Sequence, residues 1–308
     1  MNEQVVVLMS TYNGSRYLKE QIQCIFDQTY PGRITVLIRD DGSRDDTVAL
    51  AQGFPQRENR KIQVVRGENV GPQRSFLALI RMAPKADFYF FADQDDVWDP
   101  EKIQTGVDAM RPYSDVPAAA CSNYRLSDME LQVYDTAAIR ETPKFTPLQI
   151  LFYNKIPGCC MGFNHALMEK LQRMTVENVM MHDSVALALA AVTGQVLYDE
   201  QPRITHRIHR DNVVGDGHKK IVLRKWIPEK LRLLTRKEDY DLSELAENFL
   251  AVGGSQIREE YRKDLELLRD FKKSMRGTCR LLRHPDSQGR LLDRTVLSIR
   301  CKILFHIF

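Results

Sequence analysis

Four short apolar runs, each followed by a segment with helical spacing, are the feature that most limits how this 308-residue chain can fold. The runs are rich in β-branched and aromatic residues and are short enough to be buried strands. This βαβα order predicts an α/β fold with a Rossmann-like, mostly parallel sheet covered by helices, in which ligands bind beyond the carboxyl ends of the strands. The runs are VVVLM (5–9), ITVLI (34–38), IQVV (62–65) and FYFFA (88–92), and the helical patterns follow at 15–28, 45–53, 73–83 and 100–110.

Small and polar residues follow the first two predicted strands. The first strand ends in STYNG (10–14), and the second ends in RDDGS (39–43), where Gly42 permits a sharp turn. An ordinary strand-to-helix turn also explains RDDGS, because Asp, Gly and Ser are common in turns. The chain shows no GxGxxG and no phosphate-binding glycine loop, so the sequence supports neither a dinucleotide fold nor a P-loop.

The fourth strand runs into FADQDDVWDP (91–100), which carries three carboxylates within four residues. Such carboxylates repel one another, and a divalent cation is the simplest remedy. If the extended conformation continues, Asp93 and Asp95 point to one side of the chain and Asp96 to the other. Helix capping by Asp96 or Asp99 is the alternative, and it leaves Asp93 and Asp95 unexplained.

Two stretches of the second half have both a structural and a functional interpretation. In KIPGCCMGFNHAL (155–167), small residues would let a ligand approach the backbone, but a buried hairpin explains them equally well. In MMHDSVALALAAV (180–192), Asp183 stands before an Ala/Leu helix and can act as its N-cap or as a functional carboxylate. Because a helix N-terminus lowers the pKa of a nearby carboxyl group, we expect Asp183 to be ionised at neutral pH.

The cysteines and the apolar runs indicate where the protein works. The six cysteines form no CxxC pair, and no signal peptide precedes them, so they are expected to be reduced thiols in a cytoplasmic protein. No apolar run approaches the roughly 20 residues that cross a bilayer. The sequence therefore predicts a protein that is soluble or peripheral to a membrane.

The net charge of +3 hides a basic C-terminal region. Segments 219–237 and 272–302 each carry a net +7, so the remaining residues sum to −11. Segment 219–237 is a basic amphipathic stretch with Trp226 and predicts binding to an anionic membrane surface. A predicted helix at 259–283 has an apolar stripe that could pack within the protein or form a homodimer, and 296–308 is apolar with two basic residues inside it. An ordinary helical subdomain is the alternative for all three, and no nucleic-acid-binding motif is visible.

Taken together, four motifs resemble those of family 2 inverting glycosyltransferases, which have the GT-A fold. They are STYNG with Glu20, RDDGS, NVGPQRSF (69–76) and FADQDD, and the resemblance covers about residues 4 to 215. It predicts a GT-A domain at 1–215 and a basic helical C-terminal appendage at 216–308.

The resemblance implies a role for each site residue. Asp95 would be the main ligand of Mn²⁺ or Mg²⁺, and Asp183 would be the catalytic base. ITHRIHRDNVVG (204–215) matches the family's R-x-H-x-x-N-x-x-G pattern, in which Arg207 and His209 would contact the diphosphate, and His209 also the metal. His206 has no such support. The donor nucleotide would contact Thr11, Tyr12, Asn13, Glu20, Asp40 or Asp41, Asn69, Arg74 and Asp93, and the acceptor would contact Gly158, Cys159 and His182.

Within the family, the motifs most resemble bacterial rhamnosyltransferases that use dTDP-rhamnose to build surface polysaccharides. The resemblance implies a nucleotide-sugar donor, a glycan or polyprenyl-diphosphate-linked acceptor, and a cytoplasmic protein at the inner face of the cell membrane. An enzyme of the same family that uses a UDP-hexose is the alternative. A nucleotidyltransferase would need a glycine-rich activating loop, and a catalytically inactive scaffold would be expected to lack Asp95 or Asp183, but both are present.

Overall fold

The four predicted strands and four predicted helices of the first half all form in a computed structural model, which describes residues 3–179, 181–209, 240–287 and 302–304. Each apolar run lies inside a strand, and each helical pattern matches a helix to within three residues at its ends. The strands are β1 (Gln4–Thr11), β2 (Arg33–Asp40), β3 (Arg60–Arg66) and β4 (Phe88–Ala92), and the helices are α1 (Leu18–Phe26), α2 (Thr47–Gly53), α3 (Pro72–Met82) and α4 (Lys102–Met110).

All the described strands join one mixed sheet with the order β3-β2-β1-β4-β8-β6-β9-β5, and β7 pairs with β6. Strands β3, β2, β1 and β4 are parallel, β8 runs antiparallel to β4 and β6, and β6 is parallel to β9. The parallel half brings the carboxyl ends of β1, β2 and β4 to one edge. The later strands are β5 (Val97–Trp98), β6 (Ala118–Ser127), β7 (Val133–Asp135), β8 (Met161–Asn164) and β9 (Gln195–Arg207).

The glycine- and cysteine-rich stretch 155–167 is not a hairpin, so that interpretation is wrong. The 3₁₀ turn η2 (Gly158–Cys160) leads directly into β8, which pairs with β4 and β6 in the middle of the sheet. Both partners of β8 are distant in sequence, so no local hairpin forms. The small residues of this stretch instead allow close packing. A Cβ on Gly162, for example, would lie 2.5 Å from the Phe90 ring.

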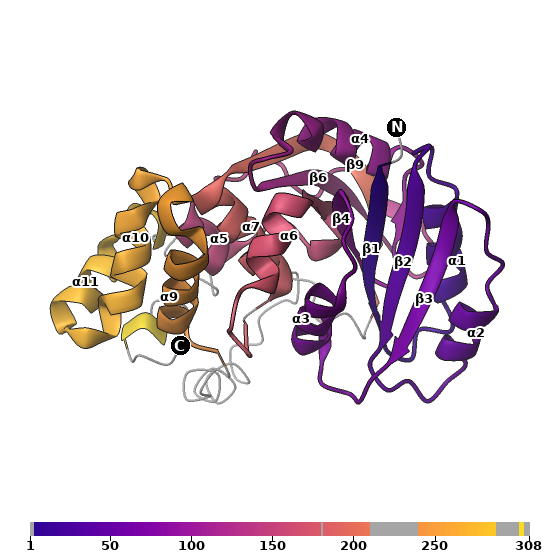
Figure 1. The fold of residues 1–308 in the computed structure, drawn as a ribbon, viewed down its shortest axis with the longest axis horizontal. Coiled ribbons are helices and arrows are strands. Elements are labelled where there is room, and N and C mark those ends of the chain that lie inside the picture. Colours follow the sequence, from indigo (N-terminus) through magenta and orange to yellow (C-terminus); the bar gives the residue numbers. More distant parts are fainter. Residues whose placement is uncertain (1–2, 180, 210–239, 288–301, 305–308) are drawn as a thin grey trace.

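Some helices of the second half pack on the sheet, and others form a helical region at one end of the molecule (Figure 1). In the ribbon, α9, α10 and α11 stand at the opposite end of the molecule from β1, β2 and β3. The helices are α5 (Pro147–Tyr153), α6 (His165–Gln172), α7 (His182–Thr193), α9 (Leu242–Gly253), α10 (Glu259–Asp270) and α11 (Met275–Arg283). The 3₁₀ turns are η1 (Arg111–Tyr113), η3 (Gly254–Gln256), η4 (Phe271–Lys273) and η5 (Pro285–Ser287).

The helix expected over 259–283 is two helices, so its predicted continuity is wrong. The chain leaves α10 through η4, and Ser274 adopts an extended conformation before α11. Ser274 Oγ accepts a hydrogen bond from the backbone N–H of Gly277 at 3.1 Å, which caps the new helix. The apolar stripe therefore splits: Leu265 and Leu268 of α10 are buried, while Met275 of α11 is exposed.

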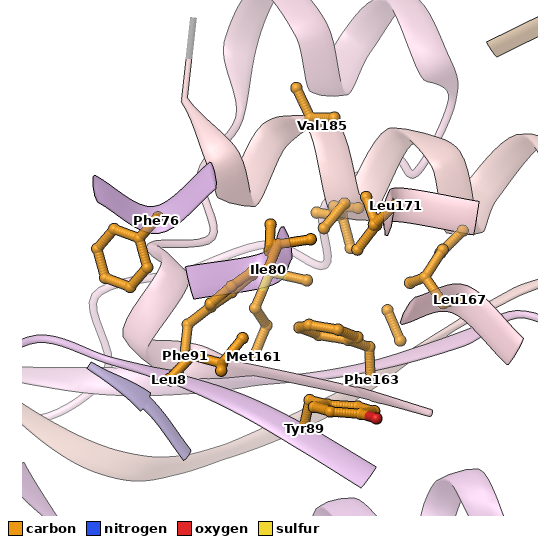
Figure 2. Packing of buried hydrophobic residues seen from close by; sticks show 14 of the residues in the cluster. Leu8, Phe76, Ile80, Tyr89, Phe91, Met161, Phe163, Leu167, Leu171 and Val185 are labelled. Atoms are coloured by element: carbon orange, nitrogen blue, oxygen red, sulfur yellow. The ribbon is translucent and has the colours of Figure 1, made fainter. Parts of the chain in front are cut away.

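One hydrophobic core runs from the sheet to the C-terminal helices. Figure 2 shows its part around β4, β8 and α6. Phe163 and Tyr89 stack across adjacent strands with ring centroids 5.6 Å apart, and Ile80, Leu167 and Leu171 close over this layer. Every residue of α7 is buried, because the sheet lies on one side of this helix and other helices on the rest. The C-terminal helices thus share one hydrophobic core with the sheet.

Several expectations fall outside the described residues. These are the basic segment 219–237, the motif residues Asn212 and Gly215, and most of 296–308, so the domain boundary at residue 215 stays a prediction. Within the described ranges, no helix has the length and apolar character needed to cross a membrane. The five described cysteines are free thiols, and three of them are buried.

Candidate functional site

The carboxyl ends of β1 and β2 lie side by side and carry the first predicted site residues. Thr11 is in parallel register with Asp40, and its Oγ1 donates a hydrogen bond to Asp40 Oδ1 at 3.2 Å. Asp40 also accepts hydrogen bonds from the backbone N–H groups of Gly42 (3.2 Å) and Ser43 (2.9 Å) and from Ser43 Oγ. The buried Asp40 carboxylate therefore fixes the turn at Gly42, whose φ of 82° suits glycine.

Asp41 connects the same edge to the start of α3. Its buried carboxylate pairs with Arg39 and accepts hydrogen bonds from the backbone N–H groups of Val70 (3.1 Å) and Gly71 (2.9 Å). The contacts hold the loop that carries Asn69 against the end of β2. Asp40 and Asp41 thus both organise this edge, and which of them contacts the donor base stays open.

The two polar residues of NVGPQRSF predicted to contact the donor lie differently. A Cβ built on Gly42 would be 3.2 Å from the backbone nitrogen of Asn69, so Asn69 borders the β2 turn, and its side chain is exposed. Arg74 is exposed on α3, and its Nε donates to Asn178 Oδ1 at 2.8 Å. The structure therefore brings Asn69 to the predicted nucleotide edge but pairs Arg74 with the segment before α7.

Tyr12 and Asn13 link β1 to the acidic loop and to the β2 turn. Tyr12 exchanges two hydrogen bonds with the side chain of Gln94: its N–H donates to Oε1 at 2.9 Å and its C=O accepts from Nε2 at 3.1 Å. Asn13, with φ of 47°, accepts from the N–H of Arg44 at 2.9 Å and donates its own N–H to Ser43 Oγ. The Tyr12 side chain is 45% exposed, so its ring offers a surface on which a base could stack.

The acidic loop does not continue the alternation of β4, so the predicted grouping of its carboxylates is wrong. β4 ends at Ala92 and the chain then bends, so the side chains that follow no longer alternate between the two faces of the sheet. Asp93 and Asp96 point into one cluster, and Asp95 faces His209 instead. The capping alternative also fails, since α4 begins at Lys102 without a side-chain cap.

Asp93 and Asp96 meet Cys159 and His206 in a compact cluster. One ligand-type atom from each residue lies within 4.8 Å of the others. His206 Nδ1 lies 2.7 Å from Asp96 Oδ1. Burial alone would lower the pKa of His206, but the charges of Asp96 and Asp93 outweigh it and raise that pKa to about 10. Burial and the neighbouring carboxylates raise the pKa of Asp93 to about 7, whereas His206 outweighs burial and lowers the pKa of Asp96.

Asp95 and His209 form a second pair next to this cluster. His209 Nε2 lies 2.7 Å from Asp95 Oδ2, and the His209 ring stacks on Tyr17 with centroids 5.4 Å apart. The two residues come from segments more than a hundred positions apart, and the antiparallel pairing of β5 with β9 brings them together. The structure therefore places the two predicted metal ligands beside each other.

Arg207 lies beneath this pair and holds the acidic loop in position. Its guanidinium donates to Asp95 O (3.0 Å), to Met129 O (2.6 Å) and to Glu20 Oε2 (2.5 Å), and it lies 4.8 Å from the Tyr17 ring centroid. Glu20 is thus tied to Arg207, and its predicted contact with the nucleotide stays a prediction. The same is true of the predicted contact between Arg207 and a diphosphate.

The residues predicted to bind the acceptor surround Asp183. A Cβ on Gly158 would lie 2.7 Å from His182 Nε2 and 3.4 Å from Asp183 Cβ, so glycine is required for this approach. The His182 ring stacks on Phe76 at 3.7 Å, and burial lowers its pKa to about 3. Cys159, the next residue after Gly158, belongs to the acidic cluster. Adjacent residues of η2 therefore touch the predicted base on one side and the acidic cluster on the other.

Asp183 is not the N-cap of α7, because Met181 occupies that position and Asp183 is inside the first turn. Its Oδ1 accepts hydrogen bonds from the N–H (2.6 Å) and the hydroxyl (3.3 Å) of Ser184. The expected direction of its pKa is wrong: burial outweighs these bonds and raises the pKa to about 6. The carboxyl is still mostly ionised at neutral pH, as the sequence predicted.

The donor atoms near the acidic loop fit a hard divalent cation. Carboxylate oxygens and an imidazole nitrogen are ligands that Mn²⁺ accepts, and oxygen ligands suit Mg²⁺. In the described part of the chain, Asp96 Oδ2 is buried without a hydrogen-bond partner, which marks the cluster as incompletely satisfied. Asp95 and His209 offer a carboxylate oxygen and an imidazole nitrogen as a second set of ligands next to this cluster.

The sequence did not predict a role for four residues of this region. They are Arg39, which pairs with Asp41; Tyr17, which supports His209; Gln94, which binds Tyr12; and His206, which pairs with Asp96. His206 stands next to Arg207 in β9, but its ion pair with Asp96 follows only from the fold. Arg39, Tyr17 and Gln94 depend on contacts between distant segments, which the sequence alone does not reveal.

Solved structures share this fold at low sequence identity. TarS (residues 1–349) of S. aureus in complex with UDP-GlcNAc aligns with a TM-score of 0.54 and 13% identity, over 99% of this chain and 90% of that one. A mannosyltransferase from Pyrobaculum calidifontis in complex with GDP-Man and Mn²⁺ aligns with a TM-score of 0.54 and 14% identity, over 100% and 86% of the two chains. The chain therefore has the α/β fold of GT-A glycosyltransferases, with a curled, mostly parallel sheet.

Sequence comparison identifies the family. The dTDP-rhamnosyl transferase RfbG of Shigella flexneri is 23% identical over 222 residues, which span 67% of this chain and 73% of the relative. The model of glycosyl transferase family 2 matches residues 6–174, which include β1 to β4, the acidic loop and η2. The match covers more than half of the chain and contains the acidic loop, so this protein belongs to glycosyl transferase family 2.

Proposed function

We propose that this protein is an inverting, metal-dependent glycosyltransferase that moves rhamnose from dTDP-rhamnose to a glycan or polyprenyl-linked acceptor. The observation that carries the proposal is the pair Gly158 and Cys159, which joins the two halves of the site. Gly158 borders Asp183, and Cys159 lies within 4.8 Å of Asp93 and Asp96. A transferase needs such an arrangement, because its base and the group that binds the donor diphosphate must lie on opposite sides of the reacting carbon.

Asp183 serves as the general base in this proposal. Its carboxylate accepts the proton of an acceptor hydroxyl while that oxygen attacks the anomeric carbon, and the bond from that carbon to the diphosphate oxygen breaks. A single displacement of this kind inverts the configuration at the carbon. With a pKa of about 6, Asp183 is basic enough to take the proton and is still mostly ionised at pH 7.

Asp95 and His209 would hold Mn²⁺ or Mg²⁺ together with the donor diphosphate. Such a cation, when bound, neutralises the charge that grows on a leaving diphosphate. The chain itself positions both ligands: Arg207 donates to the carbonyl of Asp95, and Tyr17 stacks against His209. The ligand pair is thus preorganised by residues that the sheet edge brings together.

The donor nucleotide would lie along the carboxyl ends of β1 and β2. There the exposed ring of Tyr12 is available to stack on the base, and the loop with Asn69 borders the turn at Gly42. Likeness to RfbG supports dTDP-rhamnose as the donor. The alternative is a UDP-hexose, which the TarS complex with UDP-GlcNAc supports through a shared fold only.

The acceptor would be part of a growing bacterial surface polysaccharide, and the protein would work in the cytoplasm at the inner face of the membrane. In the described residues, α11 supports this location because Arg276, Arg280 and Arg283 are all exposed. A basic face of this kind favours an anionic leaflet, where a lipid-linked acceptor resides. A homodimer through the C-terminal helices is the alternative use of this surface.

A thermal-shift panel of nucleotide sugars, each with and without Mn²⁺, tests the proposed donor. We expect dTDP-rhamnose with Mn²⁺ to raise the melting temperature more than UDP-glucose, UDP-GlcNAc or GDP-mannose, because a ligand of the native state stabilises it in proportion to its affinity. Stabilisation by a UDP-hexose alone would support the alternative donor. Equal melting temperatures with every nucleotide sugar would contradict a transferase role.

A further inference from the structure

The hydroxyl group of Ser184 lies next to the carboxylate of the proposed base, Asp183. Both side chains are buried, and Asp183 Oδ1 accepts hydrogen bonds from the backbone N–H of Ser184 at 2.6 Å and from its Oγ at 3.3 Å. The helix fixes the direction of the N–H, whereas a hydroxyl hydrogen rotates to suit its surroundings. The bond from the hydroxyl therefore needs a further group that sets its direction.

Asn154, the residue after α5, is that group. Its Nδ2 lies 3.2 Å from Ser184 Oγ. The backbone of Ile156 fixes the amide, because the Ile156 N–H donates to Asn154 Oδ1 at 3.0 Å and Asn154 Nδ2 donates to Ile156 O at 2.9 Å. A flipped amide would place two acceptors together and two donors together, so only this orientation forms both bonds.

The side chains of Asn154, Ser184 and Asp183 form a chain of hydrogen bonds with one direction. An amide NH₂ group can only donate, so Ser184 Oγ accepts from Asn154. The hydroxyl hydrogen then points elsewhere, and Asp183 Oδ1 is within its reach. In a buried chain of this kind each bond polarises the next, which strengthens the bond that reaches the carboxylate.

We propose that Asn154 and Ser184 are positioning residues for Asp183, the base of the proposed transfer. Asn154 directs the hydroxyl of Ser184 onto Oδ1, and the two bonds from Ser184 hold the carboxylate so that Oδ2 receives the proton of the acceptor hydroxyl. Ile156 stands two residues before Gly158, a predicted acceptor contact, so the same amide also anchors the chain that leads to the acceptor side. The inference rests on the proposed function, because it assigns these residues to the same reaction.

Burial raises the pKa of Asp183, and the hydrogen bonds from Ser184 are the largest influence that opposes the rise. Two ionisable neighbours of Asp183 are uncharged at pH 7, because burial lowers the pKa of His182 to about 3 and raises that of Cys121 in β6 well above its usual value. Two cations of the helices that pack on α7 pair elsewhere: Arg81 of α3 donates to Val176 O at 2.8 Å, and Lys170 of α6 donates to Val252 O at 2.9 Å.

The pKa of Asp183 in two variants tests the hydrogen bonds directly. Carbon-13 NMR follows the carboxyl carbon of Asp183 through its titration, and Asp183→Asn identifies its resonance. We expect Ser184→Ala to raise this pKa by about one unit, because the ionised carboxylate loses a hydrogen bond. Asn154→Asp should raise it as well, since the new carboxylate accepts the hydroxyl hydrogen of Ser184 and so draws it away from Asp183.

Kinetic measurements test whether the same bonds serve the transfer. The acidic limb of kcat/KM should move up by about one pH unit in Ser184→Ala. At about pH 8.5, where the base is ionised in the wild type and in the variant, kcat should still fall by about tenfold, because the carboxylate is less well oriented. The KM for the donor should stay unchanged, since Ser184 and Asn154 lie on the acceptor side.

Ser243→Ala and Asn248→Asp are the matched controls, because they make the same two chemical changes in α9. Among the described residues Ser243 Oγ has no hydrogen-bond partner, and Asn248 Oδ1 accepts from the N–H of Thr175 at 2.8 Å and from its Oγ1 at 3.0 Å. Both controls should keep the wild-type pKa of Asp183 and the wild-type pH profile.

An unchanged pKa of Asp183 in both Ser184→Ala and Asn154→Asp would overturn the inference. This holds even if both variants melt at a lower temperature, because the two residues would then have a structural role only. A wild type without transfer activity would contradict the proposed function instead, and the NMR titration would still decide whether the hydrogen bonds act on Asp183. An active wild type whose acidic limb neither variant moves would overturn the inference alone.

Discussion

At the scale of single residues, Asp183 has the most consequences for chemistry. Burial raises its pKa while two hydrogen bonds from Ser184 oppose the rise. We expect Asp183→Asn to lower kcat by roughly 10²–10⁴-fold, the usual contribution of a general base, and to leave donor affinity unchanged. Steady-state kinetics and nucleotide-sugar titration measure the two quantities. A variant that loses donor affinity as well would show that Asp183 shapes the site instead of acting on the acceptor.

The pH dependence of the reaction should report the same carboxyl group. Only the ionised form accepts a proton, and ionisation is lost as the pH falls through about 6. We therefore expect kcat/KM to be close to its maximum at pH 7 and to fall about tenfold between pH 7 and pH 5. The residual activity of Asp183→Asn should lack this acidic limb. Unchanged wild-type activity at pH 5 would contradict the assignment.

Asp95 permits a test of the proposed metal site. Asp95→Ala removes the carboxylate that lies 2.7 Å from His209, and we expect it to abolish transfer and to remove the effect of Mn²⁺ on nucleotide binding. Isothermal titration with and without Mn²⁺ measures the second effect. Full activity of the wild-type protein in excess chelator would rule out a metal role for this pair.

At the scale of secondary-structure elements, the junction between α7 and β9 is the most sensitive point. A Cβ on Gly194 would lie 1.8 Å from the backbone oxygen of Pro117, which cannot move without disturbing the start of β6. Gly194→Ala should lower the free energy of unfolding by about 3 kcal/mol or more, as severe overpacking does.

Gly53→Ala is the matched control for this substitution. A Cβ at Gly53 meets nothing within 4 Å, and the residue ends α2. Alanine there should be neutral or stabilise the fold by about 0.4–1 kcal/mol, because it restricts the unfolded chain. Urea unfolding measures both variants, and similar stabilities for the two would show that the backbone near Pro117 can yield.

The elements differ in how far the sequence predicts them. β1, β2 and β4 are predicted because each is a compact apolar run that is buried on both faces. β3 is predicted from its short β-branched run, although one of its faces is exposed. β6 and β9 are not, because β6 begins with three alanines and β9 contains Pro202 and charged residues. β6 pairs with β8 and β9, and β9 also pairs with β5, so tertiary context overrides local propensity in both strands.

The candidate site divides in the same way. Asp95, His209 and Asp183 are predicted because their motifs resemble those of a family, and the structure brings Asp95 and His209 together. Tyr17, which stacks on His209, and His206, which pairs with Asp96, are not predicted. Their roles depend on contacts between segments that are distant in the sequence. The alternation rule failed at Asp93 because the strand ends one residue earlier.

At the scale of the whole molecule, α11 carries an exposed basic face that we propose contacts an anionic membrane. Arg276, Arg280 and Arg283 recur at helical spacing on α11, so they share one exposed face, and Met275 is 62% exposed beside them. Three basic residues near an anionic leaflet favour adsorption by about 3 kcal/mol, or about a hundredfold. We expect reversal of the three arginines to glutamate to abolish co-sedimentation with anionic liposomes at low salt.

Reversal of the exposed residues Arg44, Lys61 and Arg66 to glutamate is the matched control. Lys61 and Arg66 belong to β3 and Arg44 to the loop between β2 and α2, and these elements lie at the opposite end of the molecule from α11 (Figure 1). This variant has the same net charge, so it should keep most of its liposome binding if α11 is the contact. Equal loss in both variants would mean that net charge alone attracts the membrane. A wild type that ignores anionic liposomes but elutes as a dimer would favour the dimer interface.

The complete burial of α7 limits how such a protein can be modified or recombined. The predicted base lies in the first turn of α7, and near its other end Val192 O accepts a hydrogen bond from the backbone N–H of Arg258 at 2.8 Å. The C-terminal region therefore forms part of the surface that buries α7. If the corresponding helices of a relative replaced those of this region, the Ala- and Leu-rich α7 would pack against side chains of different size and shape. Diversification of this protein would therefore have to change the exposed side of α10 and α11 while it conserves their buried side.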